Sequence, residues 1–170
     1  MQELKERIVK EGKVLPGNII KVDGFLNHRI DTELLGHIAE EFGKYFNMDE
    51  VTMILTAEAS GIALATAVAS RFHKPMIFAK KAKSDNIEGG LYQSDIYSYT
   101  YKKKVTLLVS KEWLSSDDKV LVIDDFMANG EAMRGLCDIV TAAGATLVGI
   151  GCAVEKGFQG GGDRLRAAGV

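Results

Sequence analysis

The sequence contains little cysteine, no long apolar run and almost no excess of charge. Its two cysteines, Cys137 and Cys152, have neither metal-binding nor redox spacing, which favours a reducing cytoplasm. No apolar stretch reaches the roughly 18 residues of a membrane-spanning helix, and the charged N-terminus lacks the apolar core of a signal peptide. Twenty-one basic and 23 acidic residues give a net charge of −2, which argues against a nucleic-acid or membrane-surface partner.

What the sequence does contain is a regular succession of apolar segments. A 46% apolar content over 170 residues predicts one globular domain, 1–170. The alternation of strands and helices predicts an α/β fold with a mainly parallel sheet flanked by helices. Gly169 has the features of a helix stop and Val170 those of a strand start, so we expect the domain to be truncated at its C-terminus. The expected strands are 19–22, 51–56, 76–79, 120–123 and 146–154, and the expected helices are 2–11, 31–47, 61–72, 130–143 and one capped by Asp163.

Three segments depart from this pattern. Residues 80–95 have no apolar period, and their length predicts a loop or lid. Residues 96–101 and 105–110 alternate in hydropathy, which predicts a β-ribbon. The three glycines at 160–162 predict a turn or loop.

The most informative segment is VLVIDDFMANGEA, residues 120–132. A buried strand brings Asp124 and Asp125 to the carboxyl edge of the sheet, where ligands of such folds bind. The turn that follows opens a helix, and Gly130 lets an anion approach the backbone N–H groups. Two other interpretations remain: the acids could only cap the helix, or belong to a receiver domain. Receivers carry such a pair near their N-terminus, which weakens the second interpretation.

This segment resembles the phosphoribosyl-pyrophosphate (PRPP) signature of the type I phosphoribosyltransferases. Within that family, the chain is most similar to the branch of bacterial purine salvage that acts on xanthine. The resemblance spans essentially all 170 residues and implies the type I fold with a flexible hood ribbon, which would be formed by 80–95 and the ribbon after it. The further motifs that carry it are KVDGFLNH at 21–28, EASGIA at 58–63 and EKGFQ at 155–159.

The resemblance also implies roles for the sugar-binding residues. Asp124 and Asp125 would hold the ribose hydroxyls, directly or through a Mg²⁺ ion that the substrate carries, and are the expected catalytic residues. Ser60 and Gly61 would receive the pyrophosphate at a helix start. Backbone amides would wrap the 5-phosphate of PRPP along Ala128, Asn129, Gly130, Glu131 and Ala132.

The base would be held by three residues in the same way. The resemblance implies that Lys156 donates to the exocyclic oxygen of an oxopurine, that Asn27 contacts the 2-oxo group of xanthine, and that Ile20 lies beside the base. Lys80, Lys81 and Lys83 are candidate phosphate partners or part of a solvated surface. A homodimer is implied as well. Two alternatives stay open: a guanine or hypoxanthine phosphoribosyltransferase, and a purine regulator that senses PRPP.

Overall fold

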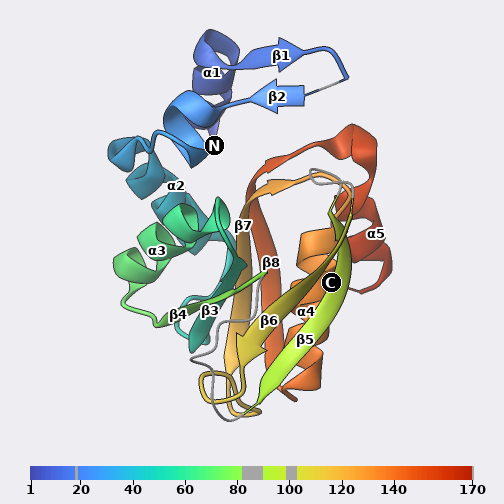
Figure 1. Ribbon diagram of the computed structural model, residues 1–170. Coiled ribbons are helices and arrows are strands. Elements are labelled where there is room, and N and C mark those ends of the chain that lie inside the picture. The colour runs from blue at the N-terminus through green and yellow to red at the C-terminus, as the bar shows by residue number, and fades with distance from the viewer. Residues whose placement is uncertain (18, 82–89, 99–102, 170) are drawn as a thin grey trace.

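The computed structural model describes residues 1–17, 19–81, 90–98 and 103–169 (Figure 1). Its centre is a four-stranded parallel sheet with the strand order β4-β3-β7-β8. This sheet confirms the predicted α/β architecture. The strands are β3 (Met53–Ala57), β4 (Met76–Ala79), β7 (Lys119–Met127) and β8 (Thr146–Glu155).

Helices cover both faces of this sheet. One face packs against α2 (Thr32–Tyr45) and α3 (Gly61–Phe72), and the other packs against α4 (Glu131–Ala142). Alternate side chains of β7 supply the two cores, because successive residues of a strand point to opposite faces. Leu121 and Ile123 belong to the α2–α3 core, whereas Val120 and Val122 belong to the α4 core. Both faces of β7 are therefore apolar and buried.

An antiparallel ribbon of β5 (Leu91–Ser98) and β6 (Lys103–Ser110) packs beside α4 (Figure 1). The expectation of a loop over 80–95 is wrong for 91–95, which are strand. The reason is that Ser94 is 7% exposed and donates a 2.8 Å hydrogen bond to Asp138 of α4, so a polar residue occupies a core position. Residues 82–89, and 99–102 with the expected ribbon turn, lie outside the described residues.

The N-terminal segment lies beyond the end of the sheet where β7 ends (Figure 1). It consists of α1 (Gln2–Glu11), β1 (Lys13–Leu15), β2 (Ile19–Lys21) and a π-helical turn, η1 (Asp23–Asn27). Phe25 and Leu26 of η1 are each only 1% exposed and join the α2–α3 core. The sequence predicts α1 and β2 but neither β1 nor η1.

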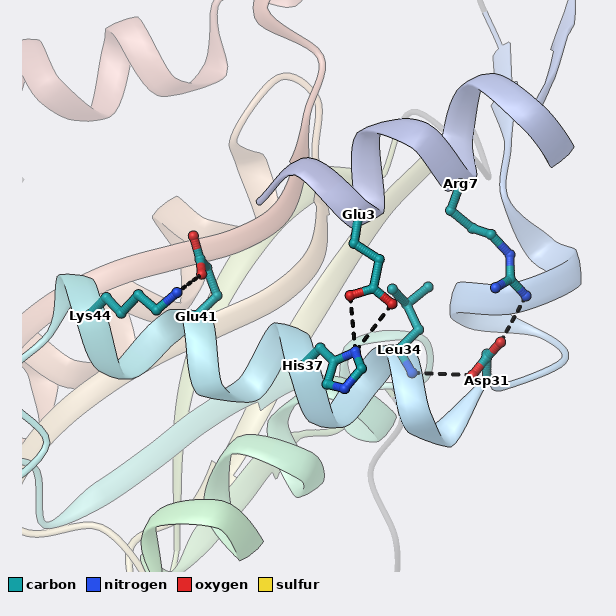
Figure 2. Close-up of polar contacts among 7 residues, drawn as sticks. All are labelled: Glu3, Arg7, Asp31, Leu34, His37, Glu41 and Lys44. Atoms are coloured by element: carbon teal, nitrogen blue, oxygen red, sulfur yellow. Dashed lines mark hydrogen bonds and ion pairs between the residues drawn. The ribbon is translucent and has the colours of Figure 1, made fainter.

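Polar contacts fasten α1 to α2 (Figure 2). Arg7 donates to Asp31 at 2.7 Å, and Nδ1 of His37 lies 2.9 Å from Oε2 of Glu3. Asp31 also caps α2 as the sequence predicts, because its Oδ1 accepts a 3.1 Å hydrogen bond from the backbone N–H of Leu34. These contacts hold the segment that leads into η1.

The C-terminal segment forms a short 3₁₀ turn, η2 (Gly157–Gln159), followed by α5 (Gly161–Ala167). The predicted last helix is present, but it begins before Asp163. The expected loop over the glycine run is therefore wrong for Gly161 and Gly162, which form the first turn of α5. Val170 lies outside the described residues. No helix in the described part of the chain is long and apolar enough to cross a membrane.

Candidate active site

Two acidic side chains lie at the carboxyl end of β7. Asp124 is 8% exposed and lies against Gly61 at the start of α3, and Asp125 is 3% exposed and contacts Asn27 and Ser60. Burial, and then the neighbouring Asp125, raise the pKa of Asp124 well above its ordinary value, while Lys81 opposes this shift. A second negative charge is therefore unfavourable beside Asp125, and a cation or a hydroxyl donor would stabilise the ionised pair.

Asp125 joins three segments that are distant in the sequence. Its Oδ2 accepts a 2.8 Å hydrogen bond from Nδ2 of Asn27 in η1, and its Oδ1 accepts a 2.9 Å hydrogen bond from Oγ of Ser60. The backbone N–H of Asp125 donates to Oδ1 of Asp124 at 2.9 Å. The structure thus brings together residues that the sequence assigned separately to base, pyrophosphate and ribose.

The turn between β3 and α3 is built around close approach to Asp124. A Cβ at Gly61 would lie 2.5 Å from Oδ1 of Asp124 and would also overlap Oγ1 of Thr56. The peptide bond between Glu58 and Ala59 is cis. These residues lie at the start of a 12-residue helix, and a helix start of this kind can bind an anion through its unpaired backbone N–H groups.

A cationic side lies opposite this turn. The backbone N–H of Lys81 donates to Oε1 of Glu58 at 2.5 Å. A cavity of about 320 Å³ lies between the turn and the ribbon, lined by Glu58, Ala59, Lys81, Lys103 and Val105. Of the three lysines that are candidate phosphate partners or solvated residues, Lys81 lines this cavity, Lys80 pairs through its backbone with Leu108 of β6, and Lys83 lies outside the described residues.

The loop after β7 forms a second cavity, of about 180 Å³, whose lining includes 126–133 and Lys81. Gly130 has φ +78°, a left-handed conformation that glycine adopts without strain. Gly161 packs against this loop so closely that a Cβ there would lie 2.7 Å from the backbone N of Gly130. Arg164 of α5 donates to the carbonyl of Asn129 at 2.5 Å. Helix α5 thus supports the loop predicted to hold phosphate.

The predicted base-binding residues lie around the same edge of the sheet. Lys156 follows β8; its backbone N–H donates to the carbonyl of Met127 at 2.8 Å, and its Nζ lies 5.5 Å from the ring centre of Phe126. Ile20 of β2 is partly buried against the α2–α3 core. Phe158 of η2 is 63% exposed and lies outside the core.

Two site residues were not found from the sequence. Thr56 is fully buried beside Asp124, and its Oγ1 has no hydrogen-bond partner in the described part of the chain. Its position at the end of a strand, just before the anion-binding turn, was a signal that could have identified it. Arg164 carried no comparable signal, because its role depends on how α5 packs against the phosphate loop.

The acid pair fits a cation that brings further ligands with it. Among the described residues, no group of three or more His, Cys, Asp and Glu side chains is placed to hold a metal ion. Asp124 and Asp125 nevertheless offer carboxylate oxygens, which Mg²⁺ prefers, and this ion usually takes only one or two carboxylates plus substrate phosphates. Asp124 and Asp125 are therefore the residues that would hold it.

A larger cavity, of about 680 Å³, lies elsewhere, between α1, α2 and β8. Its lining is mainly apolar and contains neither member of the acid pair nor the 128–130 loop. The chemistry of the buried acids, the helix starts and the cations outweighs cavity size in locating the active site.

Comparison with known proteins agrees with this geometry. The phosphoribosyl transferase domain family matches residues 25–164, and the chain therefore belongs to that family. The chain is 51% identical over 170 residues to a xanthine phosphoribosyltransferase from Bifidobacterium animalis subsp. lactis. The alignment covers 99% of this chain and 88% of the relative. It is equally 51% identical to a xanthine phosphoribosyltransferase from Lachnoclostridium phytofermentans, over 100% of this chain and 88% of the relative. The family resemblance inferred from the sequence is confirmed.

Solved structures have the same fold at lower identity. APRTase from Giardia lamblia complexed with 9-deazaadenine aligns with a TM-score of 0.81 at 20% identity, covering 96% of this chain and 91% of that chain. Adenine phosphoribosyl transferase from Trypanosoma brucei aligns with a TM-score of 0.75 at 24% identity, covering 94% of this chain and 71% of that chain. The type I phosphoribosyltransferase fold is thereby confirmed.

Proposed function

We propose that this protein is a purine-salvage enzyme that joins N9 of xanthine to C1 of PRPP. The C1–N9 bond forms, the bond from C1 to the diphosphate oxygen breaks, and the N–H proton of xanthine leaves to solvent. The products are xanthosine 5′-monophosphate (XMP) and diphosphate. The convergence of Asn27, Ser60 and Asp124 on Asp125 carries the proposal, because base, diphosphate and ribose must meet at one point. The name shared by relatives at 51% identity supports xanthine as the base.

The phosphate groups are assigned to two helix starts. The 5-phosphate lies on the backbone amides of the 128–132 loop, where Gly130 leaves room and Arg164 braces the carbonyl of Asn129. The leaving diphosphate lies at Ser60 and Gly61, with Lys81 on the opposite side of the cavity. Holding both ends of the sugar fixes C1 for attack and removes much of the entropic cost of the reaction.

The acid pair holds the ribose between these two sites. Asp124 and Asp125 accept hydrogen bonds from the ribose hydroxyls and stabilise positive charge that develops on the sugar ring. Asp124 and Asp125 would hold the Mg²⁺ that accompanies PRPP, and this ion would offset negative charge on the diphosphate. Lys81 adds a positive charge that faces the diphosphate across the cavity. No covalent nucleophile is required in this scheme.

Base selection is assigned to Lys156, Asn27 and Ile20. A lysine ammonium has three donors and no acceptor, so Lys156 pairs with the O6 of an oxopurine and repels the amino group of adenine. Asn27 donates to the 2-oxo group, which xanthine has and hypoxanthine lacks. Ile20 supplies an apolar contact beside the base.

The test is an assay of turnover with PRPP, Mg²⁺ and each of four bases, xanthine, guanine, hypoxanthine and adenine. The release of diphosphate measures the rate. Xanthine should be the best base and adenine essentially inactive. Lys156→Met, which keeps the stem and removes the charge, should lower kcat/KM for xanthine while leaving PRPP binding nearly unchanged. A preference for guanine or hypoxanthine would favour the alternative enzyme, and PRPP binding without turnover of any base would favour the regulator.

The setting of this reaction is part of the proposal. We expect residues 1–170 to act as one catalytic domain in the cytoplasm, as a homodimer. Cys137 and Cys152 are both free thiols, and burial raises the pKa of Cys152 to about 12, which is consistent with a reducing compartment and a structural rather than reactive role.

A further inference from the structure

The amide of Asn27 has its orientation fixed by Asp125. A carboxylate only accepts hydrogen bonds, so the end of the amide that faces Oδ2 of Asp125 must be Nδ2, as the 2.8 Å contact has it. The reversed amide would place its carbonyl oxygen against the carboxylate. Asp125 is itself held in place, because Ser60 donates to its Oδ1 at 2.9 Å and the side chain is only 3% exposed.

The fixed amide still has one donor to offer. An asparagine Nδ2 carries two hydrogens, and Asp125 takes one of them. Within the described residues, the side chain of Asn27 has no other hydrogen-bond partner. Because Asn27 bonds directly to the acid pair, a base joined to C1 of a ribose held by that pair would lie within reach of this remaining hydrogen.

We propose that Asp125 is a positioning residue for base selection, which makes Asn27 present a donor rather than an acceptor to position 2 of the purine. The inference rests on the proposed function. A donor at this point pairs with the 2-oxo group of xanthine. It meets the 2-amino group of guanine donor to donor, and a buried mismatch of this kind rejects the wrong ligand. The choice between xanthine and guanine is therefore made through two residues that are 98 positions apart.

Nucleotide binding tests this without requiring turnover. Calorimetry gives the Kd of XMP and of guanosine 5′-monophosphate (GMP), and the quantity of interest is the Kd of GMP divided by the Kd of XMP. In the unchanged protein XMP should bind more tightly. Asn27→Ala should reduce the ratio by about tenfold, because one hydrogen bond that distinguishes the two nucleotides is lost. Asp125→Ala should reduce it similarly, since the amide can then rotate and offer its carbonyl to GMP.

Asp124→Ala is the matched control. It removes the neighbouring buried acid and should weaken the binding of both nucleotides, yet leave their ratio unchanged, because the side chain of Asn27 bonds to Asp125 and no hydrogen bond among the described residues joins it to Asp124. In the Asn27→Ala/Asp125→Ala double variant, the ratio should be no lower than in Asn27→Ala alone, since both changes act through one contact. Should Asp125→Ala fail to fold by thermal melting, Asp125→Asn replaces it, because an amide at 125 accepts either end of Asn27 and should also reduce the ratio.

The outcomes separate the inference from the function. A wild-type ratio in Asp125→Ala alongside a reduced ratio in Asn27→Ala would overturn the inference and leave the function standing. An equal loss in the Asp124→Ala and Asp125→Ala variants would overturn it too, because the effect would then be general damage. An unchanged ratio in Asn27→Ala would also overturn the inference, because Asn27 would then not distinguish the two nucleotides. If the unchanged protein showed no preference for XMP over GMP, the proposed function itself would fail.

Discussion

Gly61→Ala should damage both the stability of the fold and the acid pair. The added methyl carbon would lie 2.5 Å from Oδ1 of Asp124 and overlap Oγ1 of Thr56. Thr56 is 0% exposed and Asp124 is 8% exposed, so neither group can move out into solvent. Relief of the overlap requires a shift of β7 or of the start of α3.

The magnitude follows from two opposing effects. Overpacking a close-packed interior costs about 1–3 kcal/mol. Replacing glycine by alanine in a helix returns up to about 1 kcal/mol, and less at a first helical position. The free energy of unfolding should therefore fall by about 1–2 kcal/mol, which lowers Tm by roughly 2–8 °C in a domain of this size.

A matched control lies in α2. Gly36→Ala makes the same chemical change inside a helix, but nothing lies within 4 Å of the added carbon. It should raise the free energy of unfolding by up to about 1 kcal/mol through helix propensity alone. Thermal melts of the two variants should therefore move in opposite directions.

Displacement of Asp124 should also lower the activity of the Gly61→Ala variant. A shift of Asp124 by about 1 Å should lower kcat/KM for PRPP by as much as about 10²-fold in Gly61→Ala. The same measurement in Gly36→Ala should give the wild-type value. If both variants melted at the same raised temperature and bound PRPP equally well by calorimetry, the close packing of Gly61 on Asp124 and Thr56 would not exist in solution.

Three further changes probe the surroundings. Thr56→Val replaces a buried, unpaired hydroxyl by a methyl of the same shape and should raise the free energy of unfolding by about 1 kcal/mol in urea melts; a decrease would mean that the hydroxyl has a partner. Asp124→Asn should increase Tm at neutral pH, because burial and Asp125 raise the pKa of Asp124 in the folded state, so wild-type stability is lost as pH rises above its unfolded pKa of about 4. The gain should vanish in melts at or below that pH, and a gain independent of pH would contradict this cause. Arg164→Met removes the 2.5 Å bond to Asn129 and should weaken PRPP binding several-fold in calorimetry with little change in Tm; unchanged binding would mean that α5 does not brace the loop.

Local sequence patterns predicted most of the central fold. The helix over 61–72 and the strand over 76–79 have the predicted bounds, because their apolar periods end at clear breakers. Residues 91–95 were misassigned because Ser94 fills a core position by bonding to Asp138, a partner 44 residues away. The start of α5 was misassigned because glycine has low helix propensity, whereas Gly161 lies in the helix where its lack of a Cβ allows close approach to the backbone of Gly130.

The site divides in the same way. The acid pair and the loop after it were found because a buried strand followed by two acids and a glycine turn is a local pattern. The contact of Asn27 with Asp125 and that of Arg164 with Asn129 span 98 and 35 residues. Such contacts depend on how η1 and α5 pack at the end of the sheet, which local periodicity does not encode.

The hydrogen bonds also separate the two acids, which the sequence left equivalent. Both carboxylate oxygens of Asp125 accept a protein donor, one from Asn27 and one from Ser60. Asp124 accepts one, from the backbone of Asp125 to Oδ1, and no donor from the described residues bonds to its Oδ2. We infer that Asp125 chiefly holds the base and diphosphate segments in register, while Asp124 retains the acceptor that a ribose hydroxyl can use. Because Asp124 is buried beside a second acid, that free acceptor makes the fold less stable at neutral pH, and a bound sugar would relieve this cost.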